Sequence, residues 1–153
     1  MQLRIYALCV TTVVLISASL AVAAPEKDPL KTRVPAAQLE EAKKLATPLF
    51  KDAKSAPPKV VEEGKALYES KGTCFNCHGK SGKGDGMAGA MLDPGARDFT
   101  NCAFQKARTD GELFWVVKNG VQGTGMVSFA PGMVTEEEAW KILAYVRSFC
   151  GAK

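Results

Sequence analysis

Apolar residues recur at helical spacing in two well-separated stretches of the 153-residue chain. The stretch VVEEGKALYESKG, residues 60–72, predicts a helix that ends at Gly72. The stretch TEEEAWKILAYVRSFCG, residues 135–151, predicts a second helix that begins at a capping box formed by Thr135 and Glu138. The apolar stripes of the two helices are Val60, Gly64, Leu67 and Tyr68, and then Ala139, Ile142, Leu143, Val146 and Phe149.

Between these helices the chain is rich in glycine. Residues 79–101 predict a long loop with a single turn at 88–92, and residues 119–132 predict a second long loop. A third helix is expected between the loops, capped by Thr109 or Asp110 and running through Val117. No stretch alternates as a strand would, so the sequence predicts an all-α domain whose long loops wrap around something.

The first 59 residues do not look like part of this domain. Residues 1–23 predict a cleaved signal peptide, with one positive charge, an apolar run and an A-x-A site ending at Ala23. An uncleaved membrane anchor is the alternative, although the run is short and broken by hydroxyl residues. Residues 24–59 predict an extension or linker with one short helix that Pro48 interrupts, and residues 60–153 predict the domain itself.

Charge and cysteine content narrow the possibilities. The net charge of +4 becomes about +3 when the leader with Arg4 is removed, which is too small to indicate nucleic-acid binding. A signal peptide implies export to an oxidising compartment, the periplasm, where idle thiols are unusual. Four cysteines remain after cleavage, namely Cys74, Cys77, Cys102 and Cys150.

The sequence GTCFNCHGK, residues 72–80, contains the strongest chemical signal. Three kinds of site use two cysteines at this spacing. A zinc site needs further ligands, but the other two cysteines stand far apart with no histidine between them. A thioredoxin-like redox pair belongs at a strand-to-helix junction, and no strand is predicted in this chain. The third kind of site is covalent haem attachment, for which C-x-x-C-H is the recognised pattern. The sequence therefore predicts haem c on Cys74 and Cys77, whose thiols add across the two vinyl groups, with His78 as the proximal iron ligand.

His78 is the only histidine in the chain, so a second histidine cannot complete the iron coordination. The sixth ligand is then a methionine, another donor such as lysine, or water. The candidates after the leader are Met87, Met91, Met126 and Met133. Met126 stands in GTGMVSF, where glycines allow the backbone to approach a ring closely.

From about residue 60 to 149 the chain resembles the class I monohaem c-type cytochromes, close to the haem subunits of haem–copper oxidases. The matching stretches are GKALYES, CFNCHGKSGKGDG, LDPGARDFTNC, DGELFWVVKNGVQGTGMVSF and TEEEAWKILAYVRSF. The resemblance implies a class I cytochrome c fold and places Met126 at the distal ligand position, with Met133 as the alternative. Val127 replaces the proline that usually follows this methionine, whereas Phe129 keeps the aromatic residue.

The resemblance also implies how the haem is held. The first and last helices should cross at Gly64 and Tyr145, and Leu92 should lie on the haem. Phe104, Trp115 and Phe129 should help to bury it. A proline normally supplies the carbonyl that accepts the N–H of the proximal histidine; Ala90 stands there, so we expect a carbonyl between Met87 and Pro94 as acceptor.

Cys102 and Cys150 are the only thiols left once the haem is attached. In an oxidising compartment two such thiols usually pair, so we expect a disulfide; two buried free cysteines are the alternative.

A haem with both axial positions filled has no site for a small-molecule substrate. The expected function is therefore that of a periplasmic electron carrier between dehydrogenase or quinol-oxidising complexes and a terminal oxidase or reductase, and not that of an enzyme. Its partners would be proteins, and it would meet membranes only through them. Lys71, Lys80 and Lys83 would face an acidic partner or are ordinary surface. A fixed haem subunit of a larger complex, and a haem enzyme or gas sensor with an open distal site, are the alternatives.

Overall fold

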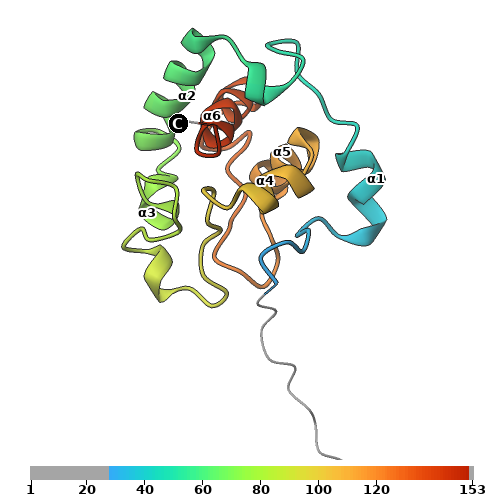
Figure 1. The fold of residues 1–153 in the computed structure, drawn as a ribbon. Coiled ribbons are helices and arrows are strands. Elements are labelled where there is room, and N and C mark those ends of the chain that lie inside the picture. Colours follow the sequence, from blue (N-terminus) through green and yellow to red (C-terminus); the bar gives the residue numbers. More distant parts are fainter. Residues whose placement is uncertain (1–27, 152–153) are drawn as a thin grey trace, which may run out of the picture.

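The computed structural model describes residues 28–151, which form a single helical domain without a β-strand in that range (Figure 1). The signal-peptide prediction for residues 1–23 lies outside the described residues. A short 3-10 helix, Gly89–Met91, interrupts the first long loop. The α-helices are α1 (Leu39–Ala42), α2 (Pro58–Glu69), α3 (Phe75–His78), α4 (Cys102–Ala107), α5 (Asp110–Asn119) and α6 (Glu136–Ser148).

Helices α2 and α6 cross closely and form the centre of the fold. A Cβ atom at Gly64 would overlap the backbone carbonyl of Lys141, so only glycine lets the two backbones approach this far. The aromatic contact forms one turn further along α2, where Tyr68 packs edge-on against Tyr145 with ring centroids 5.3 Å apart. The crossing predicted at Gly64 is therefore present, and Tyr68 is the residue of α2 that receives the aromatic ring.

Side-chain caps fix where the later helices begin. Thr135 and Glu138 form the predicted capping box of α6, with Glu138 accepting from the Thr135 N–H at 2.7 Å. Thr109 and Glu112 form a second capping box at α5. Helix α4 was not predicted; the side chain of Asn101 caps it by accepting from the N–H groups of Ala103 and Phe104. These caps set the directions in which α4, α5 and α6 leave the loops.

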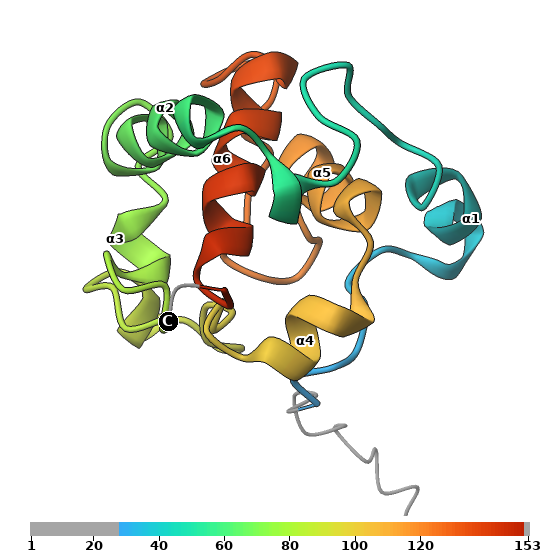
Figure 2. The same cartoon turned by 45° about the horizontal axis from the view of Figure 1, so that its top comes forward.

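The extension before α2 packs against the domain, which differs from the predicted linker. Val34, Ala42 and Ala53 are 4%, 0% and 1% exposed. The ring of Phe50 meets Trp140 of α6 edge-on at 6.3 Å. In Figure 2 the chain between α1 and α2 passes beside α5 on its way to α2. Alanines bury little apolar area and leave no strong hydropathy pattern, so the close packing of this segment is not visible in the sequence.

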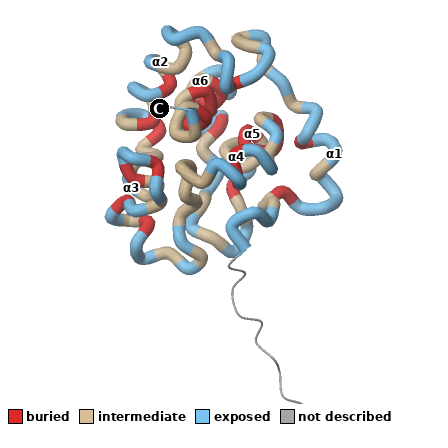
Figure 3. Tube along the Cα trace, in the orientation of Figure 1, coloured by how far each residue is buried: buried red, intermediate tan, exposed pale blue. Residues whose placement is uncertain are grey.

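Buried residues gather along α6 and where α2 and α5 pack against it, whereas the loops and α1 are mostly exposed or half-buried (Figure 3). Among residues 28–151, no helix has the length and apolar character needed to span a membrane.

Candidate haem-binding site

The C-x-x-C-H motif lies on the single turn of α3. Cys74 is the N-cap of this helix, and Cys77 and His78 belong to its only turn. Gly79 ends the helix with a φ of 73°, a conformation that favours glycine. The hydroxyl of Tyr68 donates a 2.7 Å hydrogen bond to the Gly79 carbonyl, which anchors the end of α3 to α2. Both thiols are thus displayed on one turn of a helix that the core holds in place.

The loop after α3 folds back around the motif. The N–H groups of Gly84, Gly86 and Ala88 donate to the carbonyls of His78, Cys77 and Asn76 at 2.9–3.1 Å. A Cβ at Gly89 would overlap the Cys77 carbonyl, so this glycine is needed for close approach. The glycine-rich composition of the first loop therefore serves to wrap the motif tightly.

His78 is oriented by a backbone carbonyl. Its Nδ1–H donates to the carbonyl oxygen of Arg97 at 2.9 Å, and its ring stacks on Phe99 with centroids 4.3 Å apart. The expectation of an acceptor between Met87 and Pro94 is therefore wrong by three residues. Burial lowers the pKa of His78, although the hydrogen bond to Arg97 acts in the opposite direction. A neutral imidazole with Nδ1 protonated leaves Nε2 as the free nitrogen, the arrangement typical of metal-ligating histidines.

A cavity of about 500 Å³ lies beside α3. Its size is typical of cofactor sites. Cys74, Cys77 and His78 line it, and so do Met126, Leu92 and Phe129 from the later loops. The remaining apolar wall includes Phe104, Leu113, Ile142, Leu143 and Val146. Six of the seven predicted site residues are thereby brought to one cavity, with Met126 and His78 both on its lining.

Hydrogen bonds within the second long loop hold Met126. Its carbonyl accepts from the Val121 N–H at 2.8 Å, and its N–H donates to the Thr124 hydroxyl at 3.1 Å. A Cβ at the preceding Gly125 would lie 2.5 Å from the side chain of Leu92, so the two predicted site loops touch here. Val127, which stands in place of the family's usual proline, is largely exposed.

Four residues that the sequence offers as haem contacts or iron ligands lie outside the lining of the cavity. Trp115 of α5 is half-buried but is not part of the cavity lining. Met87, Met91 and Met133 are 88%, 82% and 46% exposed and do not line the cavity either. Trp115 therefore does not help to enclose the cavity, because the face of α5 that lines it carries Glu112, Leu113, Val116 and Val117.

The four cysteines of the domain fall into two pairs. Cys102 and Cys150 lie side by side, with Cα atoms 5.4 Å apart, a separation that a disulfide can span. Cys74 and Cys77 are free thiols, and burial raises the pKa of Cys74 to about 12. A thioredoxin-like pair needs a thiol that ionises easily, so this environment argues against that alternative. No group of three or more His, Cys, Asp or Glu within residues 28–151 is placed to hold a metal ion.

Residues 59–146 match the family model described as cytochrome c oxidase, cbb3-type, subunit III. The chain belongs to this family of c-type cytochromes. Family membership makes it a haem c electron-transfer protein with an all-α class I cytochrome c fold.

The comparison with solved structures agrees with this assignment. This cytochrome is similar to a chain of the Kuenenia stuttgartiensis reducing HAO-like protein complex, with 28% sequence identity and a TM-score of 0.54. The match covers 70% of this chain and 48% of that chain, so the cytochrome spans about half the length of its neighbour. The comparison with curated proteins finds no match.

The residues present in the cytochrome fit a covalent haem. Two thiols stand on one turn at the rim of an apolar cavity, and the histidine that follows has its Nδ1–H engaged by a carbonyl. The Nε–H of Arg108 is buried and finds no acceptor among the described residues, although Arg108 lines the same cavity. Haem carries two carboxylates, the kind of acceptor that such a donor lacks.

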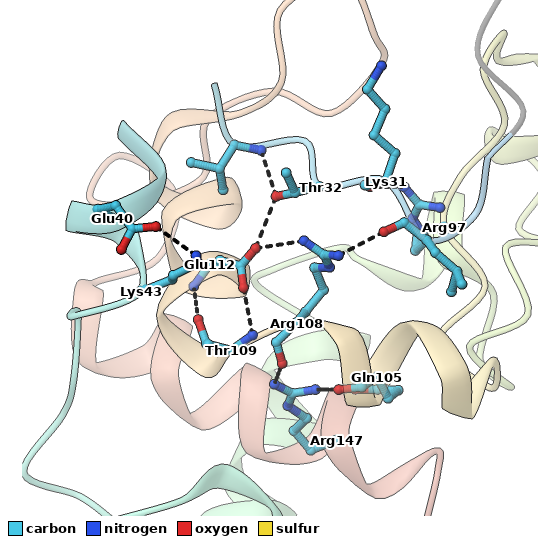
Figure 4. A network of polar contacts seen from close by, with 12 residues as sticks. Lys31, Thr32, Glu40, Lys43, Arg97, Gln105, Arg108, Thr109, Glu112 and Arg147 are labelled. Carbon is cyan, nitrogen blue, oxygen red and sulfur yellow. Dashed lines mark hydrogen bonds and ion pairs between the residues drawn. The ribbon is translucent and has the colours of Figure 1, made fainter. Parts of the chain in front are cut away.

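The sequence did not reveal a polar network beside this cavity. Glu112 accepts from Arg108 at 2.8 Å and from the Thr32 hydroxyl at 3.1 Å, and Arg108 also donates to the Leu30 carbonyl at 2.8 Å (Figure 4). Arg97 also contacts the extension, where it donates to the carbonyl of Pro29. No local motif marks the contacts with the extension, because its residues lie 66–80 positions from their partners and meet them only in the fold. Their one sequence-level signal is the capping box that places Glu112 at the start of α5.

Proposed function

We propose that this cytochrome is a periplasmic one-electron carrier with a single covalent haem c ligated by His78 and Met126. The observation that carries the proposal is the cavity that receives both His78 and Met126, in a chain with no other histidine. Haem supplies the one-electron Fe(III)/Fe(II) couple. If His78 and Met126 both hold the iron, no coordination position would be left for a substrate.

The side chains around the cavity each have a task in this function. Cys74 and Cys77 anchor the cofactor, and the carbonyl of Arg97 holds the His78 ring and increases the basicity of its Nε2. Met126 supplies a thioether ligand, which favours the reduced state. The apolar residues of α6 exclude water, which disfavours the extra charge of the oxidised centre. Together these effects favour a high reduction potential.

A fixed subunit of a larger redox complex is the second candidate. The matching family is described as an oxidase subunit, and the structural neighbour is part of a protein complex. On either reading the partners are proteins. Lys80 and Lys83 are exposed beside α3 and suit an acidic partner, whereas Lys71 already forms an ion pair with Glu138 at 2.7 Å.

The haem assignment is tested by denaturing electrophoresis followed by haem staining. The wild-type band should stain, and the Cys74→Ala, Cys77→Ala double variant should not. The matched control is the Cys102→Ala, Cys150→Ala variant, which also lacks two cysteines and should stain. Covalent haem in the first variant would overturn the assignment.

The ligation and the carrier function are tested by visible spectra of the oxidised and reduced protein, with carbon monoxide added to the reduced form. Two protein ligands should prevent carbon monoxide from binding. A carbon monoxide complex of the wild-type protein would indicate an open distal site and favour an enzyme or a gas sensor. Export is tested by fractionation, in which mature protein starting at Ala24 should appear in the periplasm.

A further inference from the structure

The haem cavity has a wall that the family match does not include. The match begins at residue 59, yet residues 28, 29 and 31–34 of the extension line the same cavity as Cys74, Cys77 and His78. Val34 is almost fully buried at the end of this segment. A segment 40 residues ahead of the haem motif is therefore built into the candidate site.

Two arginines of the domain hold this segment. Arg97 donates from its two terminal nitrogens to the carbonyls of Pro29 and Lys31, at 2.5 and 3.4 Å. Arg108 donates to the Leu30 carbonyl at 2.8 Å. The segment adds its own bond, from Thr32 to Glu112. The backbone carbonyl of Arg97 accepts from His78, so the residue that clamps the segment also orients the proximal ligand.

This end of the cavity is rich in guanidinium groups. Arg33, Arg97 and Arg108 all line it. Only Arg108 has an ion pair with a described carboxylate, that of Glu112, and its Nε–H still lacks an acceptor. Of the other acidic residues that line the cavity, Asp28 accepts from the Leu30 N–H and Asp98 from the Thr100 N–H and hydroxyl, and Asp93 is exposed. These guanidinium groups therefore retain N–H donors that a further carboxylate could accept from.

The position of the thiols indicates which edge of haem would reach these arginines. The two vinyl groups lie on one half of the ring and the two propionates on the other half. Helix α3 and the first described residues are on opposite sides of the loop that contains Arg97 in both ribbon views (Figures 1 and 2). A haem attached at α3 would therefore have its propionate half toward residues 28–34.

We propose that residues 28–34, named here the N-terminal strap, form part of the haem site and close its carboxylate edge together with Arg97 and Arg108. This proposal rests on the proposed haem function. The strap keeps water from the propionates, and the arginines neutralise them. Both effects favour the reduced state, because a buried, charge-compensated edge disfavours the additional positive charge of ferric iron.

The test measures the midpoint potential of the full-length holoprotein by spectroelectrochemistry. Val34→Asp places a carboxylate at a buried position and should detach the strap. Arg97→Gln removes the clamp and one cation but keeps the backbone carbonyl that accepts from His78. At a fixed applied potential, each change should lower the ratio of reduced to oxidised protein by about threefold or more, where tenfold corresponds to 59 mV for one electron. Arg97→Lys should recover part of the loss.

The matched control is Lys44→Gln, which removes one positive charge from an exposed position of the same extension, away from the cavity lining. Its midpoint potential should equal that of the wild type. If Val34→Asp does not fold, the near-isosteric Thr32→Val replaces it and should lower the ratio measurably, because it loses the bond to Glu112 and the bond from the Val34 N–H. Potentials of Arg97→Gln and the strap variant that match the control would overturn the proposal.

Limited trypsin digestion provides a second readout. Cleavage after Lys31 and Arg33 should be slow in the wild-type holoprotein and at least tenfold faster in the strap variant. Rapid cleavage of the wild type at both sites would show a free strap and would also contradict the proposal. Failure of the haem-stain or carbon monoxide experiment would instead reject the proposed function, so the two failures are distinguishable.

Discussion

At the scale of single residues, His78 illustrates how one side chain is prepared for its role by contacts distant in sequence. Its ring lies between the Arg97 carbonyl, which fixes the protonated nitrogen, and the Phe99 ring, which fixes its plane. The C-x-x-C-H motif identifies the residue, but its orientation depends on a loop 19 residues later.

Met126→Ala should open the iron of the holoprotein to carbon monoxide and abolish the weak charge-transfer band of methionine-ligated ferric haem. The reason is that Met126 lines the cavity with His78, whereas Met133 does not. Met133→Ala is the matched control and should leave both the band and the closed coordination unchanged. The reverse result in visible spectra would assign the distal position to Met133.

At the scale of elements, each helix is placed by one or two close contacts. Gly64 determines how near α2 comes to α6, and Tyr68 then joins α2 to the end of α3. Helix α5 is positioned by the Thr109–Glu112 capping box and by the Arg108 ion pair. The helices that form the walls of the cavity are thus held in position by contacts at their ends and at their crossings.

Gly64→Ala should destabilise the protein by about 1–3 kcal/mol, since its methyl group would overlap the Lys141 carbonyl and push α6 away. The measurement is thermal or urea unfolding followed by circular dichroism. Gly132→Ala is the control, because a Cβ there has nothing within 4 Å. Equal stabilities of the two variants would mean that the crossing does not depend on glycine.

Glu112→Gln should lower the free energy of unfolding near neutral pH by on the order of 2 kcal/mol, because Arg108 would lose its charged partner. Burial raises the pKa of Glu112, but the Thr109 N–H and the Arg108 charge outweigh it and hold the pKa below its ordinary 4.5. A lowered folded-state pKa gives stability above pH 4.5 that is lost as the pH falls through the folded value.

The wild type should therefore lose stability on acidification more steeply than Glu112→Gln. Unfolding curves at several pH values between about 3 and 7 provide the measurement. Glu41→Gln, on the exposed face of α1, is the control and should follow the wild type. Parallel pH curves for wild type and Glu112→Gln would contradict the assignment of the acid-sensitive group.

At the scale of the whole molecule, three features join parts that are far apart in sequence. The N-terminal strap lines the cavity together with residues of the later loops. The Cys102–Cys150 pair lies between the start of α4 and the chain after α6. Arg147 adds a third connection, since it pairs with Asp110 at 2.7 Å and donates to the Arg108 carbonyl. The last helix is thereby tied to α4 and to the start of α5.

We expect Cys102 and Cys150 to be disulfide-bonded in the protein purified from the periplasm. Alkylation without reduction, read by mass spectrometry, should modify neither thiol. The bond closes a loop of 48 residues, and the chain-entropy relation gives about 4 kcal/mol for that length, so the Cys102→Ala, Cys150→Ala variant should be less stable in urea unfolding. Alkylation of both sites before reduction would exclude the bond.

The sequence by itself determined whatever depends on neighbouring residues. The capping box at Thr135 and Glu138, the helical stripe from Val60 to Tyr68 and the C-x-x-C-H motif are local patterns, and their chemistry requires only the spacing along the chain. The cytochrome family and the candidate residues Cys74, Cys77, His78 and Met126 followed from such patterns.

Only the tertiary structure decided which distant groups meet. The Arg97 carbonyl beside His78, the strap across the cavity and the exclusion of Trp115 from its lining depend on how loops close and which face of α5 turns inward. Loop closure is governed by many weak contacts between residues far apart in sequence, and small buried residues such as Ala42 and Ala53 leave no periodic mark. The local chemistry was thus readable from the sequence, whereas the surroundings that tune it arise from folding.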